Sequence, residues 1–226
     1  MTEFLETDQG RRLAYDLTAG EGPTVLFLGG LKSDKEGTKA LHLEAWAKMR
    51  GQAFLRFDYS GHGQSSGSFE EGCIGDWHQD TLAAVDALTE GAILPVGSSM
   101  GGWQALLLAR ARPERIAGLV TIAAAPDFTE DSYWAGFTDA QKAELDAQGF
   151  VELPSDYMEP YRITRRMIED GRALSPLLDL LEDDVASVRK QAIWAISMVL
   201  DDADPETIDA DELANKLGAA VRERSR

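Results

Sequence analysis

A serine between two glycines is the residue of this chain that is best placed to do chemistry. Residues 97–102 read Gly-Ser-Ser-Met-Gly-Gly, after an apolar run at 92–96 and before a helix-forming run at 103–110. A G-x-S-x-G sequence between a strand and a helix is typical of a nucleophile elbow, in which the serine is held in a strained conformation with its hydroxyl exposed. The alternative is an incidental serine in a glycine-rich turn, but the context favours Ser99 as a nucleophile.

A serine hydroxyl is a poor nucleophile without a base, and the chain offers few candidates. Its three histidines, His42, His62 and His78, all precede Ser99. His62 lies between two turn glycines, which favours a loop role, and either His62 or His78 would have to come within hydrogen-bond reach of Ser99. Asp127 could be the acid that orients a base, although a helix-cap or turn role is favoured there.

Composition excludes several classes of function. The 226 residues suit one domain with or without a short appendage, and the formal net charge of −17 argues against nucleic acid and anionic membrane surfaces as partners. Residues 1–6 lack the apolar core of a signal peptide, and no apolar run is long enough to span a bilayer. No metal and no organic cofactor are implied.

The cysteine content points to a reducing compartment. Cys73 is the single cysteine, so an internal disulfide is impossible and a cytoplasmic location is expected. Glu70 and Glu71 lie beside it and disfavour a thiolate nucleophile, so we interpret Cys73 as a structural residue.

The elements that must position Ser99 alternate between strand and helix up to about residue 123. The apolar patterns predict an N-terminal hairpin that includes residues 10–16, strands at 24–28, 53–58, 92–96 and 116–122, and helices at 38–50, 74–88 and 103–110. This order predicts an α/β fold with a mostly parallel sheet and helices on both faces. Ligands of such sheets bind at the carboxyl ends of the strands, which is where Ser99 is expected.

Three linked motifs resemble those of a known family. Residues 29–34 read Gly-Gly-Leu-Lys-Ser-Asp, residues 57–65 read Phe-Asp-Tyr-Ser-Gly-His-Gly-Gln-Ser, and both precede the 97–103 segment in the order and spacing of the α/β-hydrolase superfamily. Over about residues 1–172 the chain is similar to bacterial serine hydrolases related to the mitochondrial acyl-glucuronide esterase and palmitoyl-protein thioesterase.

The resemblance implies a reaction and its residues. It implies hydrolysis of small-molecule carboxylic esters or thioesters through an acyl intermediate on Ser99. The backbone N–H groups of Met100 and Leu31 would form the oxyanion hole that binds the charge developing on the acyl oxygen. No cofactor is implied.

A change of pattern separates a lid-like segment, residues 126–172, from the rest of the 1–172 core. Its aromatic residues are scattered through polar, helix-prone sequence. They could form a lid over the catalytic face or ordinary core beneath two helices, and their spacing does not separate the two alternatives.

The remainder of the chain departs from the superfamily pattern. The superfamily order is serine, then an acid, then histidine, but no histidine and no strand-like run follow about residue 172. Residues 174–200 instead resemble one HEAT repeat of two amphipathic helices, within a helical appendage that spans 173–226. We therefore expect a sheet truncated at its C-terminal strands, with 116–122 as an exposed edge that the helices could cover.

Two functions from different classes follow. The first is a serine hydrolase whose activity is weak because the late acid and histidine are not found. The second is a non-catalytic binding or scaffold protein of hydrolase descent, which would dock a protein partner through residues 174–200. A third possibility is a composite chain, a hydrolase front joined to a repeat fragment, and cooperative unfolding would argue against it.

Overall fold

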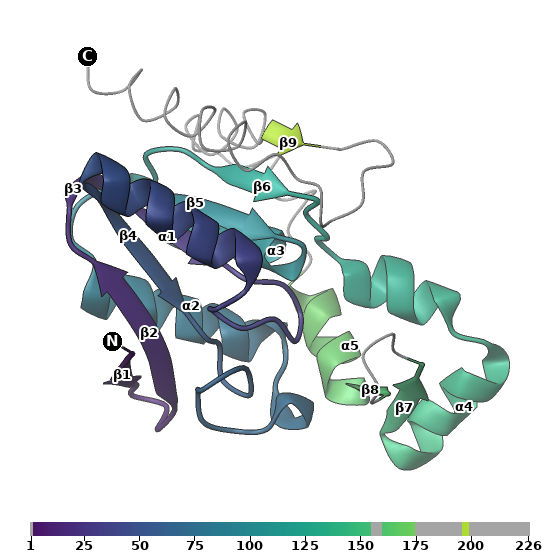
Figure 1. The fold of residues 1–226 in the computed structure, drawn as a ribbon. Coiled ribbons are helices and arrows are strands. Elements are labelled where there is room, and N and C mark those ends of the chain that lie inside the picture. Colours follow the sequence, from purple (N-terminus) through teal and green to yellow (C-terminus); the bar gives the residue numbers. More distant parts are fainter. Residues whose placement is uncertain (1, 155–159, 175–195, 199–226) are drawn as a thin grey trace.

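A mostly parallel sheet forms the centre of the molecule in the computed structural model, which describes residues 2–154, 160–174 and 196–198. Within those residues the strand order is β1-β2-β4-β3-β5-β6-β9 (Figure 1). The strands are β1 (Glu3–Glu6), β2 (Arg12–Thr18), β3 (Glu21–Leu28), β4 (Gln52–Phe57), β5 (Ile93–Ser98), β6 (Val120–Ile122) and β9 (Ile196–Met198). The β1–β2 and β2–β4 pairs are antiparallel and the other pairs are parallel, as the βαβ order predicts.

Helices cover both faces of this sheet, and the alternation of side chains along β3 shows why. Val25 and Phe27 belong to a core cluster shared with α1 (Thr38–Arg50), whereas Leu26 and Leu28 belong to one shared with α2 (Ile74–Leu88) and α3 (Met100–Ala111). Successive side chains of a strand point to opposite faces, so a continuous apolar run is buried on both. The helices predicted at 38–50 and 74–88 have those bounds in the structure.

The strand predicted over 116–122 is shorter in the structure. β6 begins at Val120, and Ile116 makes only an isolated bridge with Ile93. The backbone N–H of Ile116 donates to the carbonyl of Pro113, which closes the short 3₁₀ turn η2 (Pro113–Arg115) and keeps that group out of the ladder.

The C-terminal end of the sheet corrects one expectation. Residues 196–198 form strand β9, which pairs in parallel with β6 through Val120–Ile196 and Ile122–Met198. The helix predicted over 174–200 is therefore wrong at these three residues, and β6 is not an edge strand. A short apolar run suits helix and strand equally in sequence, and the free backbone groups of β6 offer a partner that only the fold reveals. The rest of the HEAT-like hairpin lies outside the described residues.

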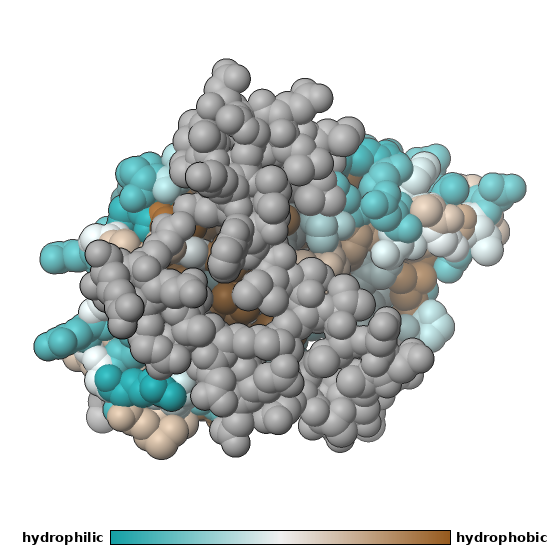
Figure 2. Space-filling view, turned by 90° about the horizontal axis from the view of Figure 1, so that it is seen from above, coloured by the Kyte–Doolittle hydropathy of each residue, from teal (hydrophilic) through white to brown (hydrophobic). Residues whose placement is uncertain are grey.

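The 126–172 segment folds into small elements beside the sheet. They are the π-helix η3 (Thr129–Trp134), α4 (Asp139–Gln148), the antiparallel hairpin of β7 (Phe150–Leu153) with β8 (Tyr161–Thr164), and α5 (Arg165–Ala173). Figure 1 shows α4, the hairpin and α5 together at one side of the molecule. Figure 2 shows brown hydrophobic residues among teal hydrophilic ones on that same side.

Aromatic rings join this segment to the elbow helix. Phe128 meets Trp103 of α3 edge-on at 5.8 Å between ring centroids, and Tyr133 meets Phe128 at 5.4 Å. Phe137 is buried in the same cluster. These contacts pack three rings of the segment against the core cluster that includes the elbow helix.

Candidate active site

Ser99 occupies a strained turn between β5 and α3. Its backbone has φ 53° and ψ −121°, a conformation that few residues with a side chain adopt. A Cβ atom at Gly97 would overlap the carbonyl oxygen of Gly101, and one at Gly101 would overlap the carbonyl oxygen of Leu28. The two glycines of the motif are therefore required by backbone contacts, as a nucleophile elbow predicts.

Hydrogen bonds fix the elbow against the end of β6. The N–H of Ser99 donates to the carbonyl of Ile122 at 3.0 Å. The carbonyl of Ser99 accepts from the N–H groups of Gly102 at 2.8 Å and Ala125 at 3.1 Å. The Ser99 residue is nevertheless exposed, so the tight turn presents it to solvent at the carboxyl end of β5.

The loop after β3 lies directly against Ser99. A Cβ atom at Gly30 would lie 3.4 Å from the Cβ atom of Ser99 and 3.4 Å from the Oγ atom of Ser33. The N–H of Ser33 donates to the carbonyl of Gly30 at 3.1 Å, and Lys32 has φ 57°, so the chain turns sharply there. This turn brings the loop that contains Leu31 beside Ser99.

Met100 supplies the second candidate oxyanion donor. It is the first residue of α3, and the first N–H groups of a helix have no partners within it. Met100 follows Ser99 directly and Leu31 follows Gly30, so the two candidate donors come from separate elements.

His62 lies in the loop after β4 and is buried there. Its Nδ1 atom lies 3.0 Å from the carbonyl oxygen of Ser60, and the rings of Tyr59, Phe69 and Trp77 surround it edge-on at 5.1 to 5.6 Å. Burial lowers its pKa, because the low-dielectric surroundings disfavour the imidazolium. These contacts fit the loop role that its flanking glycines predict.

The other two histidines lie in helices. His78 is in α2, where burial and then the charge of Arg112 lower its pKa to about 4. His42 is in α1, which packs on the opposite face of the sheet from α3. Within residues 2–154, 160–174 and 196–198, no hydrogen bond joins Ser99 to a histidine.

Asp127 starts the turn that leads into η3. Its backbone has φ 56°, and its carbonyl accepts from the N–H groups of Glu130 at 2.8 Å and Asp131 at 2.9 Å. The residue therefore has the turn role that the sequence favoured.

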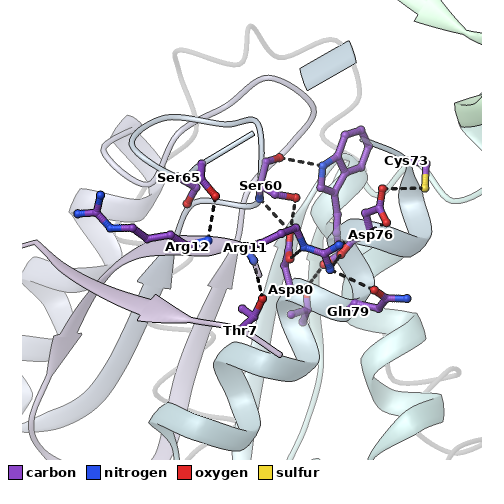
Figure 3. A network of polar contacts seen from close by, with 12 residues as sticks. Thr7, Arg11, Arg12, Ser60, Ser65, Cys73, Asp76, Gln79 and Asp80 are labelled. Carbon is purple, nitrogen blue, oxygen red and sulfur yellow. Dashed lines mark hydrogen bonds and ion pairs between the residues drawn. The ribbon is translucent and has the colours of Figure 1, made fainter. Parts of the chain in front are cut away.

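A buried carboxylate organises the His62 loop, and sequence reasoning missed it. Asp80 of α2 accepts from the N–H of Ser60 at 2.8 Å, from its hydroxyl at 2.6 Å and from Nε of Arg11 at 2.6 Å (Figure 3). Trp77 donates from Nε1 to the carbonyl of Ser60 at 3.1 Å. Burial raises the pKa of Asp80, while Ser60 and then Arg11 act in the opposite direction. An aspartate on the buried face of a helix was the signal available in the sequence.

Cys73 has a structural environment. Its thiol is buried and donates to the carboxylate of Asp76 at 3.3 Å, and burial raises its pKa to about 12. No group of three or more metal-ligating side chains occurs in the described part of the chain. Among those same residues, no helix combines the length and hydropathy that a membrane crossing requires.

Comparison with known proteins agrees with this geometry. A family model described as the alpha/beta hydrolase fold matches residues 9–187. The chain is 38% identical over 170 residues to the mitochondrial palmitoyl-protein thioesterase of Bos taurus, an alignment that covers 74% of this chain and 55% of that protein. The human protein of the same name is 40% identical over 156 residues, 69% of this chain and 51% of that protein. The chain thus spans about half the length of these curated relatives.

Two solved structures of hydrolases are also similar to this chain over nearly its whole length. A candidate hydrolase from Agrobacterium vitis has a TM-score of 0.83 and 32% identity, with 98% of each chain covered. Alpha/beta hydrolase domain-containing protein 10 from mouse has a TM-score of 0.79 and 28% identity, with 99% of each chain covered.

Proposed function

The chain belongs to the α/β-hydrolase family, and from that premise we propose that it hydrolyses carboxylic esters or thioesters through an acyl intermediate on Ser99. The observation that carries the proposal is the strained, exposed Ser99 at the elbow, with Gly30 so close that an added Cβ atom there would lie 3.4 Å from that of Ser99. The Oγ atom of Ser99 attacks the acyl carbon, and the alcohol or thiol leaves with a proton. Water then cleaves the acyl–serine bond and releases the acid.

Two backbone donors would stabilise the transition state of both steps. The N–H groups of Met100 and Leu31 are proposed to bind the negative charge that develops on the acyl oxygen. Loss of one such donor typically lowers the rate by about a hundredfold or more.

The substrate class rests on the relatives. The bovine and human relatives are named palmitoyl-protein thioesterases, so a small-molecule thioester is a natural first substrate to test beside an oxygen ester. We expect slow turnover, because none of the described histidines is bonded to Ser99. An oxyanion hole and substrate binding alone retain about 10³–10⁴-fold catalysis over water when triad members are removed.

Covalent labelling tests the proposal directly. Purified full-length protein is treated with a fluorophosphonate probe beside Ser99→Ala and Ser98→Ala variants, and adducts are located by mass spectrometry. We expect capture at Ser99, retention of labelling in Ser98→Ala and its loss in Ser99→Ala. Circular dichroism confirms that each variant is folded.

The alternative function is non-catalytic binding by a hydrolase-derived scaffold. The surroundings of two histidines favour this alternative. His62 packs against three aromatic rings and His78 lies within α2, and within the described residues neither is hydrogen-bonded to Ser99. A folded protein that fails to label and hydrolyses neither ester nor thioester would support this alternative. The partner surface predicted at 174–200 lies almost entirely outside the described residues.

A further inference from the structure

Lys32 is a cation on the loop that borders the nucleophile. It follows Leu31 directly, and its ammonium lies 4.9 Å from the ring centroid of Phe69 and 4.7 Å from that of Tyr161. The residue is exposed, and it forms no ion pair with any other described residue. This is unusual in a chain whose net charge is −17, because acidic partners are abundant on its surface.

The two rings hold the ammonium in a defined place. Phe69 stacks on Trp77 with centroids 5.8 Å apart, so its orientation is set by the core. Tyr161 is the first residue of β8. Arg162, which follows it, forms an ion pair with Glu70 at 3.0 Å. Lys32 therefore connects the candidate oxyanion loop with the β7–β8 hairpin.

We propose that Lys32 determines specificity by binding a carboxylate of the substrate, separated from the scissile carbonyl by a short spacer. The inference rests on the proposed function and adds the substrate class. Aromatic rings attract an ammonium through their π faces but offer it no oxygen or nitrogen acceptor. The three N–H donors of Lys32 are therefore available to an anion. One lysine matches one carboxylate, whereas a doubly charged phosphate calls for further cations.

The charge of the whole molecule makes such a residue useful. A net charge of −17 repels anionic substrates at long range, and a cation on the loop that borders Ser99 would offset that repulsion locally. The loop position matters because a Cβ atom added at Gly30, two residues before Lys32, would lie 3.4 Å from the Cβ atom of Ser99.

A pair of matched substrates tests the inference. The mono-4-nitrophenyl ester of adipic acid carries a carboxylate, and 4-nitrophenyl methyl adipate is its neutral counterpart. The ratio of kcat/KM for the anionic to the neutral ester should fall about tenfold or more in Lys32→Met, as expected for the loss of one charge-assisted hydrogen bond, and Lys32→Arg should restore most of it. Rising salt should weaken the preference of the native protein.

Lys142→Met is the matched control, because Lys142 also lies over an aromatic ring, that of Trp134 at 5.0 Å, but in α4. Its variant should keep the native ratio. An unchanged ratio in Lys32→Met, or an equal fall in Lys142→Met, would overturn the inference while the proposed function stands.

Binding separates failure of the inference from failure of the proposed function. If the protein hydrolyses neither ester, carbon-13 at lysine Cε reports binding without catalysis. The Lys32 signal, identified by its loss in Lys32→Met, should shift with disodium adipate and not with dimethyl adipate. No shift with adipate would reject the anion site.

Discussion

At the scale of single residues, the site depends on glycines that allow backbones to touch. The chain can place Ser99 at φ 53° only because Gly97 and Gly101 leave room for the strand, the helix and the end of β3 to meet. The conformation of Ser99 is therefore specified by residues that carry no functional group. Its strain is supported by the hydrogen bonds of Ser99 to Ile122 and Ala125.

Gly101→Ala should destabilise the fold and displace Ser99. The new methyl group would overlap the carbonyl oxygen of Leu28, and backbone atoms cannot move aside cheaply. We expect a loss of about 3 kcal/mol in the free energy of unfolding, measured by urea denaturation, because overpacking against backbone is at the costly end of such changes. Labelling of Ser99 by the fluorophosphonate should also fall.

Gly136→Ala is the control for this change. A Cβ atom at Gly136 meets no atom within 4 Å, so the same added methyl should leave stability within about 0.5 kcal/mol. Equal effects of the two substitutions would show that the contacts at the elbow are not what makes Gly101 necessary.

At the scale of elements, α5 stabilises the start of α2. The carboxylate of Asp170 accepts a hydrogen bond from the N–H of Gly75, in the first turn of α2, at 2.6 Å. Cys73, the residue before the helix, makes no side-chain capping hydrogen bond there. A carboxylate at a helix N-terminus satisfies an unpaired donor and interacts favourably with the helix dipole. The 126–172 segment is thus tied to the core by a cap supplied from a distant part of the chain.

Asp170→Ala should weaken this tie. We expect a loss of about 1 kcal/mol in stability, the usual cost of removing an N-cap, and faster hydrogen exchange at the amide of Gly75. Glu169→Ala removes the neighbouring exposed carboxylate of the same helix and should change neither quantity appreciably. If Gly75 exchanges equally fast in both variants, the cap has no energetic role.

The same scale shows how far sequence reasoning reaches. Helices α1 and α2 were predicted with their observed bounds, because their apolar spacing and flanking glycine or polar residues are local signals. The turn at Ser99 was predicted from its two glycines, because a tight strand–turn–helix brings backbones so close that no side chain fits at these positions. The capping role of Asp170 and the network around Asp80 were not predicted, since each joins residues far apart in sequence.

Strand β9 shows the same limit more clearly. Residues 196–198 contain nothing that separates a strand from a helix turn, and only the unpaired edge of β6 makes the strand favourable. The expectation that β6 would be an exposed edge failed for that reason. The proximity of the loop after β3 to Ser99 was expected from the resemblance, which fixes the order of the two segments, and a Cβ atom added at Gly30 would indeed lie 3.4 Å from that of Ser99.

At the scale of the whole molecule, β9 joins the C-terminal part of the chain to the same sheet that carries Ser99. β6 pairs with β9 on one side and with β5 on the other, and the N–H of Ser99 donates to Ile122 at the end of β6. Removing β9 therefore exposes the backbone edge of the strand that supports the elbow. A composite of independent parts would not be coupled in this way.

This arrangement predicts one cooperative transition for the full chain. Urea unfolding followed by tryptophan fluorescence and by far-ultraviolet circular dichroism should give coincident curves, since a shared sheet unfolds as a unit. A chain that ends at Leu174 lacks β9 and should be less stable by about 1–2 kcal/mol, the contribution of a few ladder hydrogen bonds at about 0.5–1.5 kcal/mol each. A chain that ends at Met198 keeps β9 and should have a midpoint nearer that of the full chain. Two separate transitions, or equal midpoints for the two shortened chains, would mean that the pairing of β9 with β6 does not stabilise the core.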